Sequence, residues 1–434
     1  MTNDNMAGLN QQAQHRTGQE DLHLAAKKLA AAVAEFDARP CPDGSDTDKA
    51  QRSAIIGAAN DILTAVKNPA DQWMDITGQI ALMGANRLFW EWGVFDQIPL
   101  DGSPMSYTDL AVKVDVQAKL LSRIGGVIVS MGVLKQVGND QVAHTERSLM
   151  FTKDNPAGLV YQMAWENGLV VYSKYPDYFA AYGRKEPETL NHVPATFAYG
   201  HPDWSFYEML EHEPERMRRF MRAMAPIEER MPIAGIYDFS WAVTAAKAPE
   251  QLQRPLFVDV GGGRGHAIKA IRAEYPALPI DRFVLQDRQE VIKAGEELDD
   301  PDLRGIRRMV IDFHQSQPLQ GALIYWIRRC LHNYGDSVSI NILRKVTEAM
   351  APDSKLLLQE DVMENPPNHM AAMLDFMMIG FGGKQRTMRD WEELVGEAGL
   401  RISGTSKGKG PWRSLAVIEC VKKEAGDGSN CVVG

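Results

Sequence analysis

Hydrophobic positions in the C-terminal part of the chain form short, nearly continuous runs that alternate with stretches of helical spacing. Five of these runs predict strands at 256–260, 282–286, 308–311, 322–327 and 355–359. Strands without polar alternation are buried on both faces, so the pattern predicts a parallel sheet covered by helices on both sides. Two later apolar runs, 400–403 and 414–421, flank a glycine-rich segment and predict a hairpin at the edge of that sheet.

The N-terminal part of the chain shows mainly helical periodicity. Residues 1–20 are polar and predict a solvated tail, whereas helical spacing begins at Asp21 and resumes at 51–66 and 73–92. Between the first two helices, residues 37–49 are rich in Pro, Gly, Ser and Asp, a composition typical of a linker.

Residues 105–151 combine helices with a short hairpin. Ser106 and Asp109 have the spacing of a helix N-cap, a second amphipathic helix follows, and a Gly-Asn-Asp turn separates two strand-like runs. This order is that of a winged helix. The second helix carries only two basic residues, Lys119 and Arg123, so it lacks the contacts that DNA recognition requires. We therefore interpret the element as a docking module.

These patterns divide the chain into five regions and predict an α/β fold preceded by a mostly helical domain. The regions are a flexible tail, helix and linker (1–49), a winged-helix-like domain (50–151), a helical connector with a substrate-pocket segment (152–250), a Rossmann-like α/β domain (251–423) and a flexible C-terminal tail (424–434). The functional residues are expected mainly in the α/β domain, at the ends of its strands.

The composition and net charge of the chain disfavour several classes of binding partner. Of 434 residues, 44% are apolar and 24% are charged, which is the composition of an ordinary globular protein. The net charge of −10 disfavours binding to nucleic acid, and no apolar run approaches the roughly 18 residues of a membrane span. The polar N-terminus predicts no signal peptide, and four scattered cysteines predict neither a disulfide framework nor a metal site. We therefore expect a cytoplasmic protein without nucleic-acid or membrane partners.

A glycine-rich loop follows the first predicted strand of the sheet. In the segment Asp259-Val-Gly-Gly-Gly-Arg-Gly-His266, four glycines allow the backbone to turn sharply and to approach a ligand closely. The spacing departs from the dinucleotide-binding pattern, because His266 stands where the third glycine of that pattern is required. The acidic Asp259 at the start of the loop favours a cationic ligand over a phosphate.

The next two strands end in residues that suit a nucleoside. Asp287, at the end of the second strand, is placed to accept hydrogen bonds from ribose hydroxyls. At the end of the third strand, Asp312 can accept a hydrogen bond from an adenine amino group, and Phe313 can cover the ring. Ligands of open α/β sheets bind beyond the carboxyl ends of the strands, where these residues are expected to meet the glycine loop.

His332 follows the fourth predicted strand and is expected at the same edge of the sheet. Its imidazole, with an ordinary pKa of about 6.5, can accept a proton near neutral pH from a hydroxyl group that is reacting. Together with the strand ends QD and DF, the ordered segments DVGGGRGH, RRCLHNYGD, KLLLQED and GGKQRT resemble the plant- and fungus-type O-methyltransferases of small molecules. The resemblance covers roughly residues 50–420 and is strongest to the fungal natural-product branch.

This resemblance implies S-adenosylmethionine as the cofactor, a class I methyltransferase domain and an N-terminal domain that forms a homodimer. The cofactor contacts of the family correspond here to Gly261, Gly262 and Gly263 for the methionine portion, Asp287 for ribose, Asp312 and Phe313 for adenine, and Arg328. The catalytic positions correspond to His332 as general base, Glu360 as the carboxylate that orients it, and Gln385 where the family has a second acidic residue. The activity implied is methyl transfer to a hydroxyl of an aromatic or polyketide-like small molecule in secondary metabolism, without a metal ion.

Two positions differ from the family pattern and leave an alternative activity open. Asn333 follows the base where the family often has aspartate, and Gln385 cannot stabilise an imidazolium as a carboxylate does. Some fungal relatives bind S-adenosylmethionine but catalyse pericyclic ring closures. In such a reaction Lys384 and Arg386 could polarise a carbonyl group.

The small-molecule acceptor is expected against flexible and aromatic apolar side chains. Thioethers adapt to irregular ligands and aromatic rings stack on flat ones, so two methionine- and phenylalanine-rich stretches are candidates. From these stretches we predict a substrate pocket formed by Phe220, Met224, Met373, Met377 and the adjacent Lys384.

Overall fold

The structure is a computed structural model that describes residues 3–39, 42, 45–153, 155–248 and 253–423. The chain forms two compact units, residues 1–155 and 156–434. No helix in the described part of the chain is both long enough and apolar enough to cross a membrane. The predicted C-terminal tail, 424–434, lies outside the described residues, as do Cys41 and Cys431.

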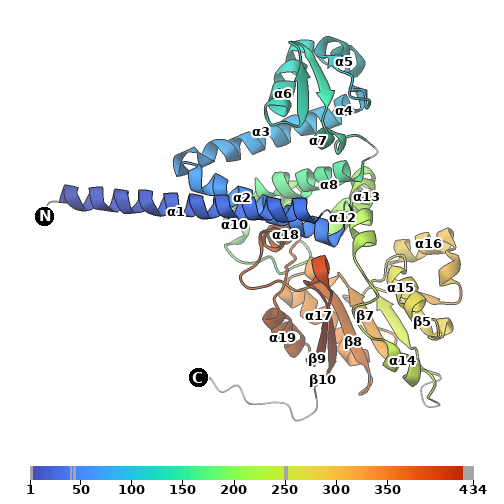
Figure 1. The fold of residues 1–434 in the computed structure, drawn as a ribbon. Helices are drawn as coiled ribbons and strands as arrows, with labels where there is room; N and C mark the ends of the chain where they lie inside the picture. Colours follow the sequence, from blue (N-terminus) through green and yellow to red (C-terminus); the bar gives the residue numbers. More distant parts are fainter. Residues whose placement is uncertain (1–2, 40–41, 43–44, 154, 249–252, 424–434) are drawn as a thin grey trace. The chain divides into compact units, whose positions relative to one another are not determined.

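The N-terminal unit consists of helices and one small sheet (Figure 1). Its elements are α1 (Asn3–Ala38), α2 (Asp46–Val66), η1 (Pro69–Asp71), α3 (Gln72–Glu91), α4 (Val94–Gln97), β1 (Met105–Ser106), α5 (Tyr107–Val114), α6 (Ala118–Ser130), β2 (Leu134–Val137), β3 (Gln141–His144) and α7 (Glu146–Leu149). Because α1 begins at Asn3, residues 3–20 are helical, whereas we predicted a tail for residues 1–20. This stretch has no apolar stripe, but its Ala, Gln, Glu and Met residues favour helix without one.

The predicted order of helix, helix and hairpin in this unit is confirmed. The three strands form an antiparallel sheet in the order β1-β3-β2, and α5 and α6 precede the β2–β3 hairpin. The Ser106 hydroxyl accepts a hydrogen bond from the Asp109 backbone N–H at 3.0 Å, which is the predicted cap of α5. A buried stripe on α6, including Leu121 and Ile128, faces the inside of the unit.

The C-terminal unit begins with the predicted helical connector. Its helices are α8 (Pro156–Ala164), η2 (Trp165–Leu169), α9 (Val170–Tyr172), α10 (Tyr175–Tyr182), α11 (Pro194–Ala198), α12 (Phe206–His212), α13 (Pro214–Arg230) and α14 (Ser240–Ala245). The α/β part follows, with β4 (Phe257–Val260), α15 (His266–Glu274), η4 (Ile280–Arg282), β5 (Phe283–Asp287), α16 (Gln289–Leu298), η5 (Pro301–Leu303), β6 (Arg307–Val310), β7 (Ile324–Arg328), η6 (Leu331–Asn333), α17 (Asp336–Ala349), β8 (Lys355–Asp361), α18 (His369–Ile379), α19 (Met388–Glu397), β9 (Leu400–Lys407), η7 (Gly410–Trp412) and β10 (Leu415–Lys422).

All seven strands of the α/β part lie in one sheet with the order β6-β5-β4-β7-β8-β10-β9. The five predicted apolar strands are parallel to one another, as expected for strands that are separated by helices. β9 and β10 form the predicted antiparallel hairpin at one edge, with β10 inserted between β8 and β9. The strand order reverses direction between β4 and β7, which are adjacent in the sheet. The glycine loop after β4 and the turn after β7 therefore follow neighbouring strands.

Alternate residues of the central strands pack against helices on opposite faces of the sheet (Figure 1). On one face, Tyr325 and Ile327 of β7 pack with α17 and α19. On the other face, Ile324 and Trp326 pack with α14, α15 and α16. The sheet is therefore rigidly held between two apolar layers, and its polar strand ends are the places left for chemistry.

Candidate functional site

The glycine loop is fastened to the neighbouring strand and leaves little room for side chains. The backbone N–H groups of Gly261 and Gly262 donate to the Gln286 carbonyl of β5 at 2.8 and 3.1 Å. Gly261 has a φ of +70°, which favours glycine. A Cβ atom at Gly262 would lie 2.4 Å from Asp259 Cγ and 2.5 Å from Leu285 Cδ1. The tight turn therefore requires glycine at both positions.

Two carboxyl groups lie at this loop, one fully buried and one partly buried. Asp259 is 1% exposed, its Oδ2 has no hydrogen-bond partner among the described residues, and burial raises its pKa to about 7 against the opposing effect of Arg328. Asp287 accepts hydrogen bonds from the backbone N–H groups of Gly263 and Arg288, both at 2.8 Å, and burial also raises its pKa. A cation bound here would favour the ionised carboxylates, so the loop suits a positively charged ligand.

The residues predicted for adenine also reach this edge of the sheet. The Phe313 ring lies against the glycine loop, and Asp312 Oδ1 accepts a hydrogen bond from the His314 backbone N–H at 3.0 Å. Tyr334, which the sequence analysis did not single out, lies beside them. Its ring centroid is 6.1 Å from that of Phe313 and 5.0 Å from that of His314, nearly perpendicular to both. Only its place two residues after His332 could have indicated it.

His332 lies in the turn that follows β7, next to the strand that carries the glycine loop. At Arg329 the backbone takes a φ of +50°, an unfavourable value for a residue with a side chain, and turns the chain out of the strand. His332 is 7% exposed and Glu360, on β8, is 1% exposed. His332 Nδ1 lies 3.5 Å from Glu360 Oε2, and Glu360 Oε1 accepts a hydrogen bond from the Leu331 backbone N–H at 3.0 Å.

Burial shifts the pKa values of His332 and Glu360 toward the neutral forms of both groups, so they do not form a simple ion pair. The pKa of His332 is held well below its usual value, first by burial and then by the positive charges of Arg329 and Arg386. The pKa of Glu360 is raised to about 7, mainly by burial, although Arg329 and the hydrogen bond from Leu331 act in the opposite direction. The imidazole is therefore neutral at physiological pH, with a proton-accepting nitrogen available.

The Gly-Gly-Lys-Gln-Arg-Thr segment runs along the His332 turn. A Cβ atom at Gly383 would lie 2.3 Å from the His332 carbonyl oxygen, and the Lys384 backbone N–H donates to that same oxygen at 2.8 Å. Gln385 is 9% exposed, and its backbone N–H donates to Asp375 Oδ1 at 2.8 Å. The role of the Gln385 side chain beside the base stays a prediction.

The positively charged side chains of this segment are committed to partners within the chain. Lys384 Nζ lies 3.1 Å from Glu186 Oε2 and 3.1 Å from Asp336 Oδ2. Arg386 is fully buried and donates to Asp336 and to backbone carbonyls of the His332 turn. Arg386 has no exposed surface and donates four hydrogen bonds within the chain, so these contacts do not support a role in polarising a substrate, which stays a prediction. Lys384, predicted for the substrate pocket, is held in two ion pairs.

The residues predicted to contact the acceptor lie on two helices of the C-terminal unit. Phe220 on α13 packs against an aromatic cluster that includes Phe206, with ring centroids 5.5 Å apart, and Phe381 lies 4.4 Å from Phe206 on another side. Met224, also on α13, and Met377, on α18, are partly buried, whereas Met373 on α18 is 46% exposed. Their contact with an acceptor stays a prediction.

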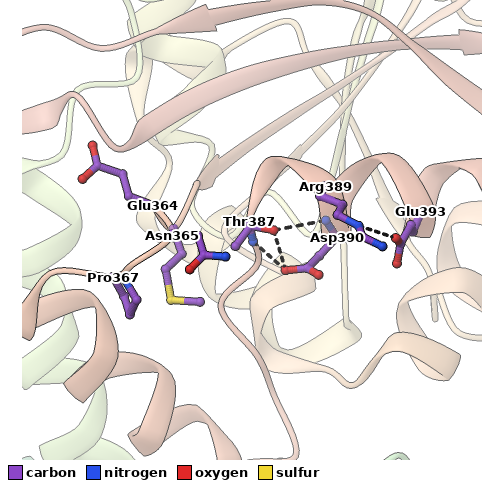
Figure 2. Close-up of a pocket in the computed structure, with 8 residues that line it drawn as sticks. Glu364, Asn365, Pro367, Thr387, Arg389, Asp390 and Glu393 are labelled. Carbon is purple, nitrogen blue, oxygen red and sulfur yellow. Dashed lines mark hydrogen bonds and ion pairs between the residues drawn. The ribbon is translucent and has the colours of Figure 1, made fainter.

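A surface cavity of about 410 Å³ lies at the beginning of α19 (Figure 2). Four of its polar lining residues are paired with one another: Thr387 and Asp390 form the predicted capping box, and Arg389 Nε donates to Glu393 Oε1 at 2.9 Å. None of the predicted cofactor or catalytic residues lines it. Among the described residues, no group of three or more His, Cys, Asp or Glu side chains could hold a metal ion.

The strand order, the glycine loop and the acidic strand ends define a class I methyltransferase that uses S-adenosylmethionine. Residues 184–401 match the model of the O-methyltransferase domain family. The chain is 37% identical to methyltransferase cfoD of Aspergillus candidus over 92% of its own length and 98% of that protein. It is 30% identical to O-methyltransferase kntB of Aspergillus niger over 83% of its length and 86% of that protein. The chain belongs to this O-methyltransferase family of fungal secondary metabolism.

Solved structures show the same fold. The structure of OxaC matches with a TM-score of 0.80 at 22% sequence identity, over 94% of this chain and 100% of that chain. LepI in complex with SAM matches with a TM-score of 0.73 at 23% identity, over 92% of this chain and 99% of that chain. OxaC has also been crystallised in complex with SAH and oxaline. The predicted fold class and cofactor are thus confirmed.

Proposed function

We propose that this protein transfers the methyl group of S-adenosylmethionine to a hydroxyl oxygen of an aromatic or polyketide-like small molecule, with His332 as the general base. The observation that carries the proposal is a buried imidazole next to Glu360, in the turn after the strand that neighbours the strand of the glycine loop; burial and two arginines hold its pKa below the usual value. A neutral imidazole can take a proton from a hydroxyl group as its oxygen reacts. The family assignment supports methyl transfer, and the base supports oxygen as the acceptor atom.

The residues of the loop fit the cofactor by charge and by shape. S-adenosylmethionine carries a sulfonium and an ammonium group, and Asp259 has an unpartnered buried oxygen at the loop. We assign Gly261, Gly262 and Gly263 to the methionine portion, Asp287 to the ribose, and Asp312 and Phe313 to the adenine, with Arg328 at the end of β7. When bound, the cofactor supplies an electrophilic methyl group.

Within this scheme the chain's own residues orient the acceptor and hold its proton. Glu360 faces Nδ1 of His332, so Nε2 is the ring nitrogen that receives the hydroxyl proton. Glu360 acts as a positioning residue, and it stabilises the imidazolium once the proton has moved. Gln385 contributes a neutral amide on the same turn, where an acidic residue would add charge. Most of the rate enhancement then comes from holding the hydroxyl near the methyl group.

The direct test uses isotopically labelled S-adenosylmethionine and a panel of phenolic and polyketide acceptors. We expect label in an ether product, no turnover by His332→Ala, and an affinity of that variant for S-adenosylhomocysteine within about twofold of the unmodified protein. His332 touches the acceptor in this scheme, whereas the cofactor residues other than Arg328 lie on other strand ends. If His332→Ala keeps most of the activity, His332 is not the base.

The alternative function, a pericyclic ring closure without methyl transfer, has less support. It depended on Lys384 and Arg386 as polarising groups, and both are held in contacts within the chain. The presence of a neutral histidine base favours methyl transfer instead. In the labelled assay, a product with a changed carbon skeleton and unconsumed S-adenosylmethionine would establish the alternative.

We also propose that the protein is a homodimer that associates through its N-terminal unit. A row of large apolar side chains on α2 and α3 is exposed: Ile56, Leu63, Val66, Trp73, Met74, Ile76 and Ile80. Exposed apolar patches of this extent are typical of interfaces between subunits. Light scattering after size exclusion should give twice the mass of 48.3 kDa, and Ile76→Glu should reduce it to one chain. A single-chain mass for the unmodified protein would contradict this proposal.

A further inference from the structure

Arg386 connects the two elements that carry His332 and Glu360. Its guanidinium donates to the Leu331 carbonyl at 3.0 Å and to the Tyr334 carbonyl at 2.9 Å, on either side of His332. Its own backbone carbonyl accepts a hydrogen bond from the Met363 N–H at 2.9 Å, just after the strand that bears Glu360. One residue thus holds the turn of the base by its side chain and the strand of the carboxylate by its main chain.

The guanidinium is itself held in place from a third side. Asp336 Oδ1 accepts a hydrogen bond from Arg386 Nε at 2.9 Å and lies 2.7 Å from Nη2. The Trp391 ring on α19 lies 5.3 Å from the guanidinium carbon. Arg386 is fully buried, and a buried guanidinium is costly unless its donors are satisfied. This site satisfies them with acceptors of the base-bearing turn.

From these contacts we infer that Arg386 is a positioning residue that keeps the His332 imidazole in register with the Glu360 carboxylate. The inference rests on the proposed function and adds a residue to it. The planar fork of arginine fits the role, because it reaches two carbonyls and a carboxylate at once, whereas a lysine ammonium is a single point charge. The positive charge has a second effect, since Arg386 lowers the pKa of His332 and keeps the base neutral.

Two substitutions separate geometry from charge. Arg386→Lys keeps the charge but loses the fork, so we expect kcat to fall by roughly 10–100-fold while the affinity for S-adenosylhomocysteine stays within about twofold. In Arg386→Gln the charge is lost as well, so the pKa of His332 rises and the acid limb of the pH–rate profile moves to higher pH. The limb should not move in Arg386→Lys. If Arg386 had a purely structural role, both variants would lose stability, but the acid limbs of their pH–rate profiles would not differ.

Controls keep the test independent of folding. Arg389→Lys, on the adjacent helix α19, changes an exposed arginine that pairs with Glu393 and should leave kcat and thermal stability unchanged. Asp336→Ala removes one partner of the guanidinium at a partly exposed position and should lower kcat less than Arg386→Lys does. If Arg386 variants do not fold, a normal kcat and pH profile in Asp336→Ala overturns the inference. Unchanged kcat in a folded Arg386→Lys overturns it directly.

Amide hydrogen exchange gives a readout that needs no turnover. The Asn333 and Tyr334 amides are bonded within the turn, to the Cys330 and Leu331 carbonyls. In Arg386→Lys we expect faster exchange over residues 331–336 and unchanged exchange in β4. Should the unmodified protein transfer no methyl group to any acceptor, the proposed function fails, and exchange alone then decides the inference. Equal exchange in the variant and the unmodified protein would refute it.

Discussion

Gly262→Ala tests the geometry of the glycine loop most sharply. The new methyl group would lie 2.4 Å from Asp259 Cγ and 2.5 Å from Leu285 Cδ1, where ordinary contacts begin near 3.4 Å. Both neighbours, or the loop itself, must therefore move by about 1 Å. Both neighbours are 1% exposed in the packed sheet, so neither can swing into solvent. Overpacking of this kind costs about 1–3 kcal/mol, and the rigid surroundings place this site at the upper end, about 2–3 kcal/mol.

The structure gives a specific reason why a side chain at position 262 should weaken cofactor binding. From the sequence we expected the glycines to let the loop approach a ligand closely, yet a Cβ atom at Gly262 would point at the chain's own Asp259. Weaker cofactor binding should then follow from a displaced loop and carboxylate, together with a loss of stability. A direct steric block would instead weaken binding in a protein of normal stability.

The assay combines thermal unfolding with calorimetric titration of S-adenosylhomocysteine. At about 2–4 °C per kcal/mol for a unit of this size, Gly262→Ala should lower the unfolding midpoint by about 5–10 °C. The matched control is Gly295→Ala in α16, where the added Cβ meets nothing within 4 Å and glycine costs helix stability. That variant should be more stable by about 0.5–1 kcal/mol. Equal stability of Gly262→Ala and the unmodified protein would refute the packing argument.

Three further predictions concern the base and the segment beside it. Glu360→Gln should lower kcat by about 10–100-fold with little change in cofactor affinity, because the amide cannot stabilise the imidazolium; single-turnover kinetics with labelled cofactor measures this. The pKa values of Asp259 and Glu360, both about 7, lie above those of unfolded carboxyls, so the folded state binds more protons and stability falls as pH rises toward and through 7. The protein without cofactor should thus unfold at a higher temperature at pH 6.5 than at pH 8. Glu360→Gln should reduce this difference, and a larger difference in that variant would contradict the raised pKa of Glu360. Thr387→Ala removes the cap of α19 and should cost about 1 kcal/mol in urea unfolding without changing cofactor affinity.

Much of the fold could be predicted from the sequence because its information is local. Near-continuous apolar runs predict the parallel strands, and glycine and aspartate residues predict the turns that follow them. The glycine loop, Asp287, Asp312 and Phe313 follow strands directly, so the rule that ligands bind at strand ends brings them together. The first part of the N-terminal helix, residues 3–20, was missed for the opposite reason, since helix propensity without an apolar stripe leaves no periodic signal.

The pairing of distant side chains was decided only by the tertiary structure. Lys384 and Arg386 are adjacent to Gln385 in sequence and looked equally available to a substrate. Folding places Arg386 in a fully buried site with acceptors about 50 residues away, and it joins Lys384 to Glu186, nearly 200 residues away. Long charged side chains can reach many partners, so sequence spacing does not select among them. The ordered motifs of the sequence, through their resemblance to a family, therefore indicated the cofactor, whereas only folding brought the Arg386 side chain into contact with the turn that carries His332.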